Sequence, residues 1–235
     1  MDPTILFIDI ETVSQTNNYE GLSDRLKTQW ERKSSFLKND NDLSPEDMYY
    51  DKAAIYAEYG KVVTIGLGYF TPNEDGESTL RLTSIAHHDE KELLKEFTMM
   101  LSKFSSDKLQ LCGHNAKEFD FPYLCRRLLI NDFKLPYILD TSGKKPWEVN
   151  HLDTMEMWKF GDWKHYTSLD LLASIFDIES SKDNIDGSQV GRVYYEENDL
   201  DRIAQYCMRD VAVTAQLYLK LKVGEGIKPE HIIYV

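Results

Sequence analysis

The segment TILFIDIET, residues 4–12, constrains the fold of this chain more than any other. Side chains alternate between the two faces of a β-strand, so Asp9 and Glu11 point the same way. Apolar residues on both faces are typical of a central strand that is covered on both sides. Ionised carboxylates buried there would be costly unless they were compensated. The segment therefore indicates either a solvated strand end or a site that needs acids.

The composition describes an acidic chain of 235 residues, with 27 basic and 40 acidic side chains and a formal charge of −13. This length suits one α/β domain, so residues 1–235 are interpreted as a single domain. The charge disfavours a protein that coats nucleic acid through phosphate contacts alone, whereas bound cations would let an acidic enzyme act on a nucleic-acid end. The sequence shows no secretory signal pattern or membrane span, so a cytoplasmic protein is expected.

The three cysteines, Cys112, Cys125 and Cys207, are odd in number and lack a CxxC spacing. This usage argues against a disulfide framework and against a zinc site. Reduced cysteines that pack in the interior are expected.

The rest of the chain alternates between strand and helix patterns. Strands are predicted at 61–70, 80–86 and 108–115, and helices at 89–104, from Phe119 onwards with Pro122 in the first turn, and at 199–222. The polar segment 14–59 reads as a helical insertion, with helical spacing in LSDRLKTQWERKSSFL and a second helix start at Ser44 and Pro45. Mixed and helical patterns follow at 151–160 and 168–178, and a glycine-punctuated loop at 180–193.

Two further acids lie in distant segments. Asp120 belongs to GHNAKEFDFPYL, residues 113–124, where alone it would serve as a helix N-cap. Asp210 belongs to YCMRDVAVT, where Tyr206 stands four residues earlier on the same helical face. Alone, that pair would most simply form a buried hydrogen bond.

The acids acquire a different meaning if they meet at one place. Close carboxylates repel by about 4 kcal/mol per pair at an effective dielectric constant of about 20. Divalent Mg²⁺ or Mn²⁺ prefers such oxygen ligands, and two ions about 4 Å apart can stabilise both the attacking and the leaving oxygen in phosphodiester cleavage.

The ordered segments FIDIET, HNAKEFDFPYL and YCMRDVAVT resemble the three motifs of DEDD-type 3′-to-5′ exonucleases. The position of Tyr206 indicates the tyrosine subgroup, DEDDy. The chain is similar to the proofreading exonuclease domain of family B DNA polymerases and to stand-alone bacterial relatives of that domain. The resemblance implies an α/β, RNase H-like fold: a mixed sheet flanked by helices, with the helical insertion after the first strand.

The resemblance also implies roles for particular residues. It makes Asp9, Glu11, Asp120 and Asp210 the metal ligands, and it makes Tyr206 the residue that orients the attacking water. An unperturbed tyrosine has a pKa near 10, which favours positioning over general-base catalysis.

The resemblance implies further residues around that centre. The backbone at Thr12 and Val13 would hold the terminal nucleotide, and Asn115 and Phe119 would line the strand groove, although Phe119 fits a core position equally well. Three basic residues, Lys117, Lys182 and Arg192, are either phosphate contacts or solvated surface charges. Asp153 matches a family acid outside the metal set, with a structural role expected.

The expected function is metal-dependent removal of nucleotides from the 3′ end of single-stranded nucleic acid, DNA before RNA, with two divalent cations. One alternative is a catalytically silent nucleic-acid-binding module on the same fold. A second alternative is a two-metal nucleotide phosphohydrolase or an endonuclease. The sequence leaves open whether a polymerase or repair partner is engaged.

Overall fold

A mixed sheet of six strands organises the structure, a computed structural model that describes residues 4–104, 108–162, 166–181 and 185–235. The strand order is β5-β4-β1-β2-β3-β6. The pairs β1/β2 and β2/β3 are antiparallel, whereas β1/β4, β4/β5 and β3/β6 are parallel. The strands are β1 (Thr4–Ser14), β2 (Gly60–Pro72), β3 (Ser78–Ala86), β4 (Leu109–Gly113), β5 (Leu152–Asp153) and β6 (Ile232–Tyr234).

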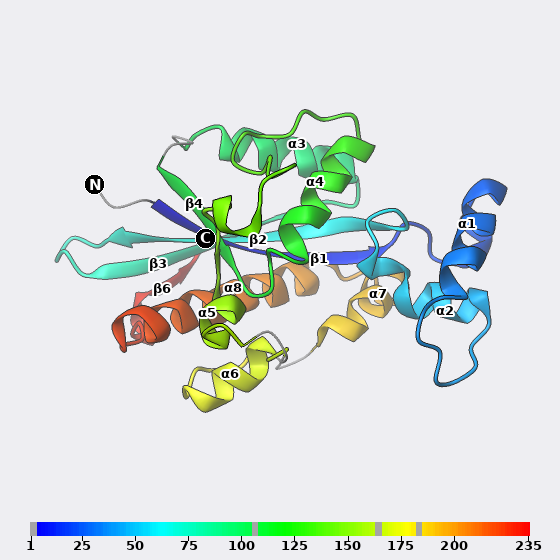
Figure 1. Cartoon of the computed structure of the whole chain (residues 1–235). Helices are drawn as coiled ribbons and strands as arrows, with labels where there is room; N and C mark the ends of the chain where they lie inside the picture. The colour runs from blue at the N-terminus through cyan, green and yellow to red at the C-terminus, as the bar shows by residue number, and fades with distance from the viewer. Residues whose placement is uncertain (1–3, 105–107, 163–165, 182–184) are drawn as a thin grey trace.

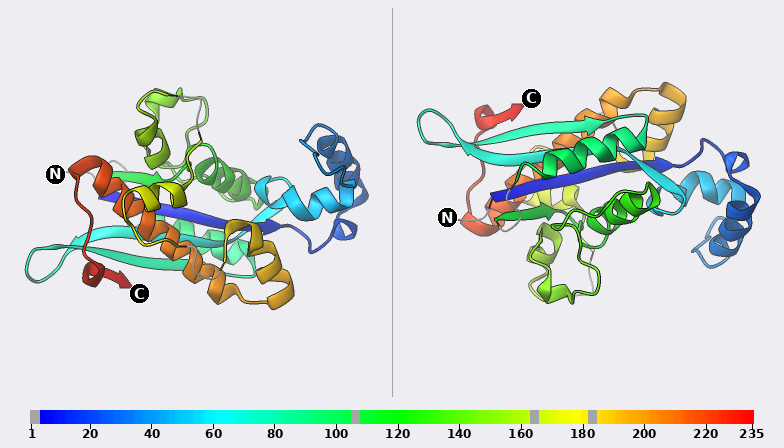
Figure 2. Two further views of the ribbon diagram at one scale, coloured as in Figure 1. Left: turned by 90° about the horizontal axis from the view of Figure 1, so that it is seen from below. Right: turned by 90° about the horizontal axis from the view of Figure 1, so that it is seen from above.

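Helices cover both faces of this sheet. Figure 1 shows α3 (Glu90–Leu101) and α4 (Asp120–Ile130) above it, and α8 (Leu200–Val223) below it together with α5 (Thr154–Lys159) and α6 (Leu169–Ile175). Figure 2 shows the same sandwich from below and from above, with α8 crossing the sheet along much of its length. None of the described helices combines the length and the apolar character that crossing a bilayer requires.

The remaining helical elements lie in the segments that connect these strands and helices. They are η1 (Tyr19–Gly21), α1 (Asp24–Ser34), α2 (Pro45–Lys52), η2 (Ala53–Ile55), η3 (Pro146–Glu148), η4 (Gly187–Gln189), α7 (Val190–Arg192), a π-helix (Val193–Glu197) and η6 (Pro229–His231).

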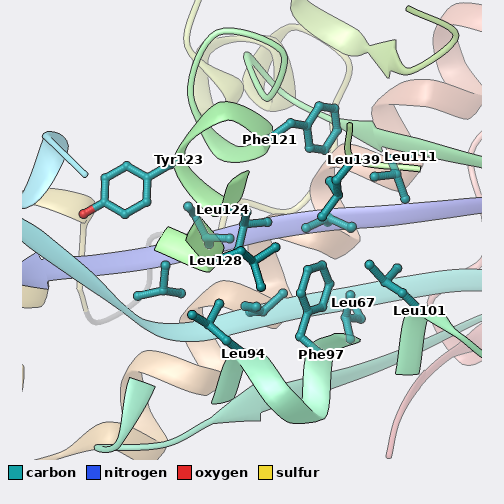
Figure 3. Packing of buried hydrophobic residues seen from close by; sticks show 14 of the residues in the cluster. Leu67, Leu94, Phe97, Leu101, Leu111, Phe121, Tyr123, Leu124, Leu128 and Leu139 are labelled. Atoms are coloured by element: carbon teal, nitrogen blue, oxygen red, sulfur yellow. The ribbon is translucent and has the colours of Figure 1, made fainter. Parts of the chain in front are cut away.

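The central position predicted for the first strand is confirmed, because β1 has a neighbour on each side. Ile8 packs in the cluster under α3 and α4, where Phe97 and Leu128 meet the sheet (Figure 3). Phe7 points the other way and packs with Val211 of α8. The face that carries Phe7 also carries Asp9 and Glu11, so these acids face α8.

Two glycines of β2 bring α8 close to the sheet. A Cβ at Gly66 would lie 2.9 Å from the Cys207 carbonyl oxygen, and a Cβ at Gly68 would lie 2.7 Å from Val211 Cγ1. Any side chain at either position would push α8 outward. The absence of a side chain there lets α8 carry its polar residues to the level of β1.

Residues 15–59, between β1 and β2, contain the expected helices. Ser23 caps α1 and Ser44 caps α2, whose first residue is Pro45. Trp30 is buried, and its indole nitrogen donates to the Pro45 carbonyl at 2.7 Å. This segment therefore has a small core of its own, which Figure 1 shows at the far end of β1.

The structure differs from the sequence-based prediction at three places. The short strand β6 was not predicted, because three residues beside an edge strand give too little pattern. Within 180–193, the described residues contain η4, α7 and the start of the π-helix rather than loop alone. Asp120 is the first residue of α4, with Phe119 at the N-cap, so Asp120 is not the N-cap.

The three cysteines are free, as expected.

Candidate active site

Asp9 and Glu11 lie side by side on β1, with Glu11 buried and Asp9 half-buried. Cys207 of α8 lies behind them, and its thiol donates to Asp9 Oδ2 at 3.4 Å. One ligand atom from each of these three residues lies within 4.8 Å of the others. Two strand acids and a helix thiol thus meet at one point between β1 and α8.

Asp120 reaches the same region from α4. Its side chain is 4% exposed, and Oδ1 accepts a hydrogen bond of 3.0 Å from the backbone nitrogen of Ile10. Ile10 lies between Asp9 and Glu11 in β1. The hydrogen bond therefore fixes the start of α4 against the strand that carries the other acids.

Asp153 fixes the turn that precedes α4. Its carboxylate accepts from the backbone nitrogens of Asn115 at 2.9 Å and Lys117 at 3.1 Å, and it caps α5 through Met155. Asn115 adopts a left-handed conformation with φ of 60°, which asparagine tolerates better than most residues. Asp153 therefore has the structural role expected of it.

Asp210 and Tyr206 approach from α8. Ser181 donates to Asp210 Oδ1 at 2.5 Å, and the Tyr206 hydroxyl is hydrogen-bonded to Asp210. Tyr206 is 5% exposed and packs with Val13 and Ile203. Asp9, Tyr206 and Asp210 line one cavity of about 270 Å³.

The electrostatics of this cluster are dominated by burial and by like charge. Burial raises the pKa of Asp9 and Glu11 well above the usual values, and the charges of Asp210 and Asp120 raise both further. Burial also raises the pKa of Asp120 to about 7. The charged neighbours that shift the pKa of Asp9 are all acids, so ionising the whole cluster requires a cation.

The donor set suits a hard divalent cation. Carboxylate oxygens are the ligands that Mg²⁺ and Mn²⁺ prefer. Burial and the neighbouring acids raise the pKa of the Cys207 thiol well above its usual value. Its sulfur is a soft ligand, which suits Mg²⁺ and Mn²⁺ less well than carboxylate oxygen. The groups that suit such an ion are the carboxylates of Asp9, Glu11 and Asp210. The Asp120 oxygen that does not accept from Ile10 suits it as well.

The four residues expected to hold a nucleotide are not among those that line this cavity, and their environments differ. Thr12 donates its hydroxyl to the Ala54 carbonyl at 2.9 Å, and Val13 is fully buried beneath Tyr206. Asn115 Oδ1 is buried and makes no hydrogen bond within the described residues. Phe119 is half-buried and packs against the Tyr123 ring at 5.4 Å. Asn115 is thus the member of this group with an unpaired polar atom, and that atom is buried.

The basic candidates are engaged with acids. Lys117 pairs with Glu156 at 2.8 Å, and Arg192 pairs with Glu197 at 2.5 Å. Lys182 lies outside the described residues. These pairs match the surface-charge alternative for Lys117 and Arg192.

Several cavity residues were not singled out from the sequence. The cavity is also lined by His114, Tyr166, Ser168, Leu169, Asp170, Ser181 and Gly187. The His114 ring bridges Thr154 Oγ1 and the Thr167 carbonyl, both at 2.9 Å, and so fastens the 166–168 segment over the site. The sequence offered one signal for this group, because Ser168 is of the residue type that caps helices and it caps α6. A helix cap by itself indicates a structural role, so Ser168 did not mark the cavity.

Comparison with known proteins agrees with this geometry. The sequence model of a family described as predicted 3′-5′ exonucleases related to the exonuclease domain of PolB matches residues 55–230, about three quarters of the chain. The chain belongs to this family. Family membership supports nuclease activity on nucleic acid with divalent metal ions. The matched range contains Asp120, Tyr206 and Asp210, whereas Asp9 and Glu11 precede it.

A solved structure shares the fold. The chain is similar to the family B DNA polymerase from the hyperthermophilic archaeon Pyrobaculum calidifontis, with a TM-score of 0.56 and 16% sequence identity. The match covers 94% of this chain and 25% of the polymerase chain, so the chain spans about a quarter of that protein. The fold is therefore RNase H-like, with its mixed sheet flanked by helices as predicted.

Proposed function

We propose that this chain, acting as one domain, removes nucleotides from the 3′ end of single-stranded nucleic acid, with DNA preferred to RNA. Two divalent cations, Mg²⁺ or Mn²⁺, are required, and nucleoside monophosphates are released. The observation that carries the proposal is the cavity in which Asp9 and Asp210 meet the Tyr206 hydroxyl. A scaffold for binding alone has no need of acids that repel one another in a buried site.

The chain's own residues have separable tasks in this reaction. Asp9, Glu11, Asp120 and Asp210 would hold the cations, which when bound would make the attacking water more acidic and offset charge on the phosphate. Burial and the charge of Asp210 raise the pKa of Tyr206 further above its ordinary value, so its hydroxyl stays protonated. Tyr206 therefore positions the water by hydrogen bonding and does not act as a base.

A strand-degradation assay tests the proposal. A single-stranded DNA labelled at its 5′ end, incubated with Mn²⁺, is expected to give a ladder that shortens from the 3′ end. Asp210→Asn should lower the rate by at least about 10³-fold, which corresponds to about 4 kcal/mol in the barrier. Asp201→Asn, at an exposed acid in the first turn of the same helix, is the matched control and should retain the rate. Full activity of Asp210→Asn would overturn the assignment.

Other substrates separate the alternatives. Cleavage of circular single-stranded DNA would indicate an endonuclease, and turnover of free nucleoside triphosphates would indicate a nucleotide phosphohydrolase. Strand binding without turnover in either metal would indicate a silent module. A parallel RNA strand of the same sequence gives the sugar preference.

A further inference from the structure

The insertion between β1 and β2 meets the acidic site at one backbone carbonyl. The Ala54 carbonyl, in η2, accepts from Thr12 Oγ1 and from the Tyr123 hydroxyl, both at 2.9 Å. Thr12 directly follows Glu11 in β1, and Tyr123 lies three residues after Asp120 in α4. One carbonyl of the insertion therefore joins the two elements that carry these acids.

The pairing of β1 with β2 is irregular directly after Glu11. Glu11 lies opposite Thr64 of β2. The next residue, Thr12, lies opposite Val62, so Val63 is the extra residue of a bulge. A bulge increases the local twist and re-aims the side chains around it. The direction of the Glu11 side chain therefore depends on how this step of the backbone is held.

No side-chain hydrogen bond holds the Glu11 carboxylate within the described residues, although the side chain is buried. The charges that act on it, Asp210 and Asp120, repel it. Thr12 points to the opposite face of β1, toward the cluster under α4, because side chains alternate along a strand. Its hydrogen bond to Ala54 thus fixes the backbone beside Glu11 and leaves both carboxylate oxygens available.

The Ala54 carbonyl is itself fixed by α4 and by the insertion. Tyr123 is fully buried, and Figure 3 shows its ring at the edge of the apolar cluster with the hydroxyl directed away from the labelled leucines. One turn further along α4, Arg127 Nη1 donates to the Ala57 carbonyl at 2.8 Å. Ala53, just before Ala54, packs in the core of the insertion. The last part of the insertion is therefore held on both sides before β2 begins.

We propose that the insertion, residues 15–59, positions Glu11 for cation binding through the Ala54 carbonyl. Thr12 and Tyr123 are the positioning residues that transmit this constraint. The inference rests on the part of the proposed function that makes Glu11 a metal ligand. Replacing a residue that orients a metal ligand typically weakens metal binding by roughly 10–100-fold.

Binding of Mn²⁺ to the full chain without nucleic acid tests the proposal, with the free ion measured by electron paramagnetic resonance. Tyr123→Phe keeps the ring and removes its hydroxyl, and Thr12→Val keeps the shape and removes the other hydroxyl. Each should raise the apparent Mn²⁺ dissociation constant about tenfold. Thr12→Ser keeps a hydroxyl and should bind as wild type does. Unchanged Mn²⁺ binding in Tyr123→Phe and Thr12→Val would overturn the proposal.

The double variant Thr12→Val/Tyr123→Phe tests whether the two hydroxyls act through one carbonyl. If they do, the first substitution already releases the constraint and the second adds little. Removing both should then weaken Mn²⁺ binding by much less than about 100-fold, the product of two independent tenfold effects. A full product would mean that the hydroxyls act separately and would overturn the role given to Ala54.

Tyr49→Phe is the matched control for a general loosening of the insertion. Tyr49 is fully buried in the core of the insertion, and its hydroxyl lies 2.9 Å from Thr16 Oγ1. Its loss should lower the urea midpoint about as much as Tyr123→Phe does, while Mn²⁺ binding stays as in wild type. Equally weakened Mn²⁺ binding in both variants would overturn the path through Ala54.

Nuclease activity is scored separately, at saturating Mn²⁺. The rate of 3′ trimming by Tyr123→Phe should then approach that of wild type with an unchanged KM for DNA, because the variant impairs metal binding alone. Weakened Mn²⁺ binding in Tyr123→Phe without any trimming by the wild-type protein would support this inference and refute the proposed nuclease function. Trimming by wild type with equal Mn²⁺ affinity in both proteins would do the reverse.

Discussion

Two acidic sites in the interior of this molecule, the single residue Glu90 and the cluster around Asp9 and Glu11, are compensated in different ways. Glu90, 8% exposed, accepts from Arg127 Nε at 2.8 Å and Nη2 at 2.5 Å, from Asn131 at 2.9 Å and from the Val62 backbone nitrogen at 2.8 Å. Asp9 and Glu11 on β1 have instead Asp120 and Asp210 as the charged neighbours that shift their pKa values. Glu90 therefore has its compensating cation, Arg127, within the fold.

The difference separates a structural acid from a functional one. A buried carboxylate that has a bidentate guanidinium and two further donors needs nothing from outside the chain. A cluster in which neighbouring charges oppose ionisation is stable only with protons or with added cations. Burial alone therefore does not mark an active site, whereas the sign of the surrounding charge does.

The largest effect on stability is expected from removing Arg127, the cation that compensates Glu90. Arg127→Met would leave Glu90 buried without its charge partner, and the free energy of unfolding should fall by about 3–5 kcal/mol in urea denaturation. Adding Glu90→Gln should recover part of that loss. Arg126→Met, at the exposed neighbouring position, is the control and should cost less than about 0.5 kcal/mol. A loss below about 1 kcal/mol for Arg127→Met would contradict the comparison.

Removing one charge from the acid cluster should have the opposite sign. The pKa of Asp120 is about 7 in the fold against a usual 3.8, so its contribution to stability is complete below pH 3.8 and is lost as pH rises through 7. Asp120→Asn keeps the oxygen that Ile10 bonds but cannot ionise. In EDTA, its stability relative to wild type should rise between pH 4 and pH 7 by roughly 2–4 kcal/mol.

Urea denaturation at a series of pH values measures this difference. Asp75→Asn, in the exposed turn between β2 and β3, is the control and should show a flat difference over the same range. A flat profile for Asp120→Asn as well would mean that burial and the neighbouring acids do not disfavour the ionised form of Asp120.

Supplying the missing cation should stabilise the wild-type protein. Mg²⁺ or Mn²⁺ at about 100 times its dissociation constant should add about 2.7 kcal/mol, or a rise in melting temperature of about 5–10 °C for a chain of this size. Differential scanning fluorimetry at pH 8 measures it. Asp9→Asn should lose most of the shift and Asp75→Asn should keep it, so an equal shift in both would place the ion elsewhere.

The sequence predicted the first four strands and the long helices because their periodicity is strong and their caps are explicit, but it did not fix the order of the strands in the sheet. Asp9 and Glu11 were placed on one face by alternation alone. The convergence of Asp120 and Asp210 on them came from the resemblance, since no local pattern encodes how closely α8 approaches β2. That approach depends on Gly66 and Gly68, whose role is visible only in the packed structure.

The site roles of His114 and Cys207 could not be predicted from local sequence patterns, for a similar reason. His114 acts through Thr154 and the Thr167 carbonyl, which are 40 and 53 residues away, so no window of sequence contains the contact. Cys207 appeared only as a packing residue, because its hydrogen bond to Asp9 joins α8 to β1 across 198 residues. Contacts between distant segments decide these roles.

The smallest expected effect comes from Tyr206→Phe, which tests whether Tyr206 acts in the reaction or in holding the metal ions. Tyr206→Phe leaves every carboxylate in place and removes the hydroxyl that is bonded to Asp210, so the melting-temperature shift with Mn²⁺ should match wild type. The rate of 3′ trimming should nevertheless fall about tenfold, equivalent to about 1.4 kcal/mol, because the water loses one orienting partner. Tyr195→Phe, at a tyrosine whose hydroxyl donates to the Ser14 carbonyl outside the cavity, is the matched control. A lost metal shift in Tyr206→Phe would instead make the tyrosine part of the cation site, and an unchanged rate would remove it from the reaction.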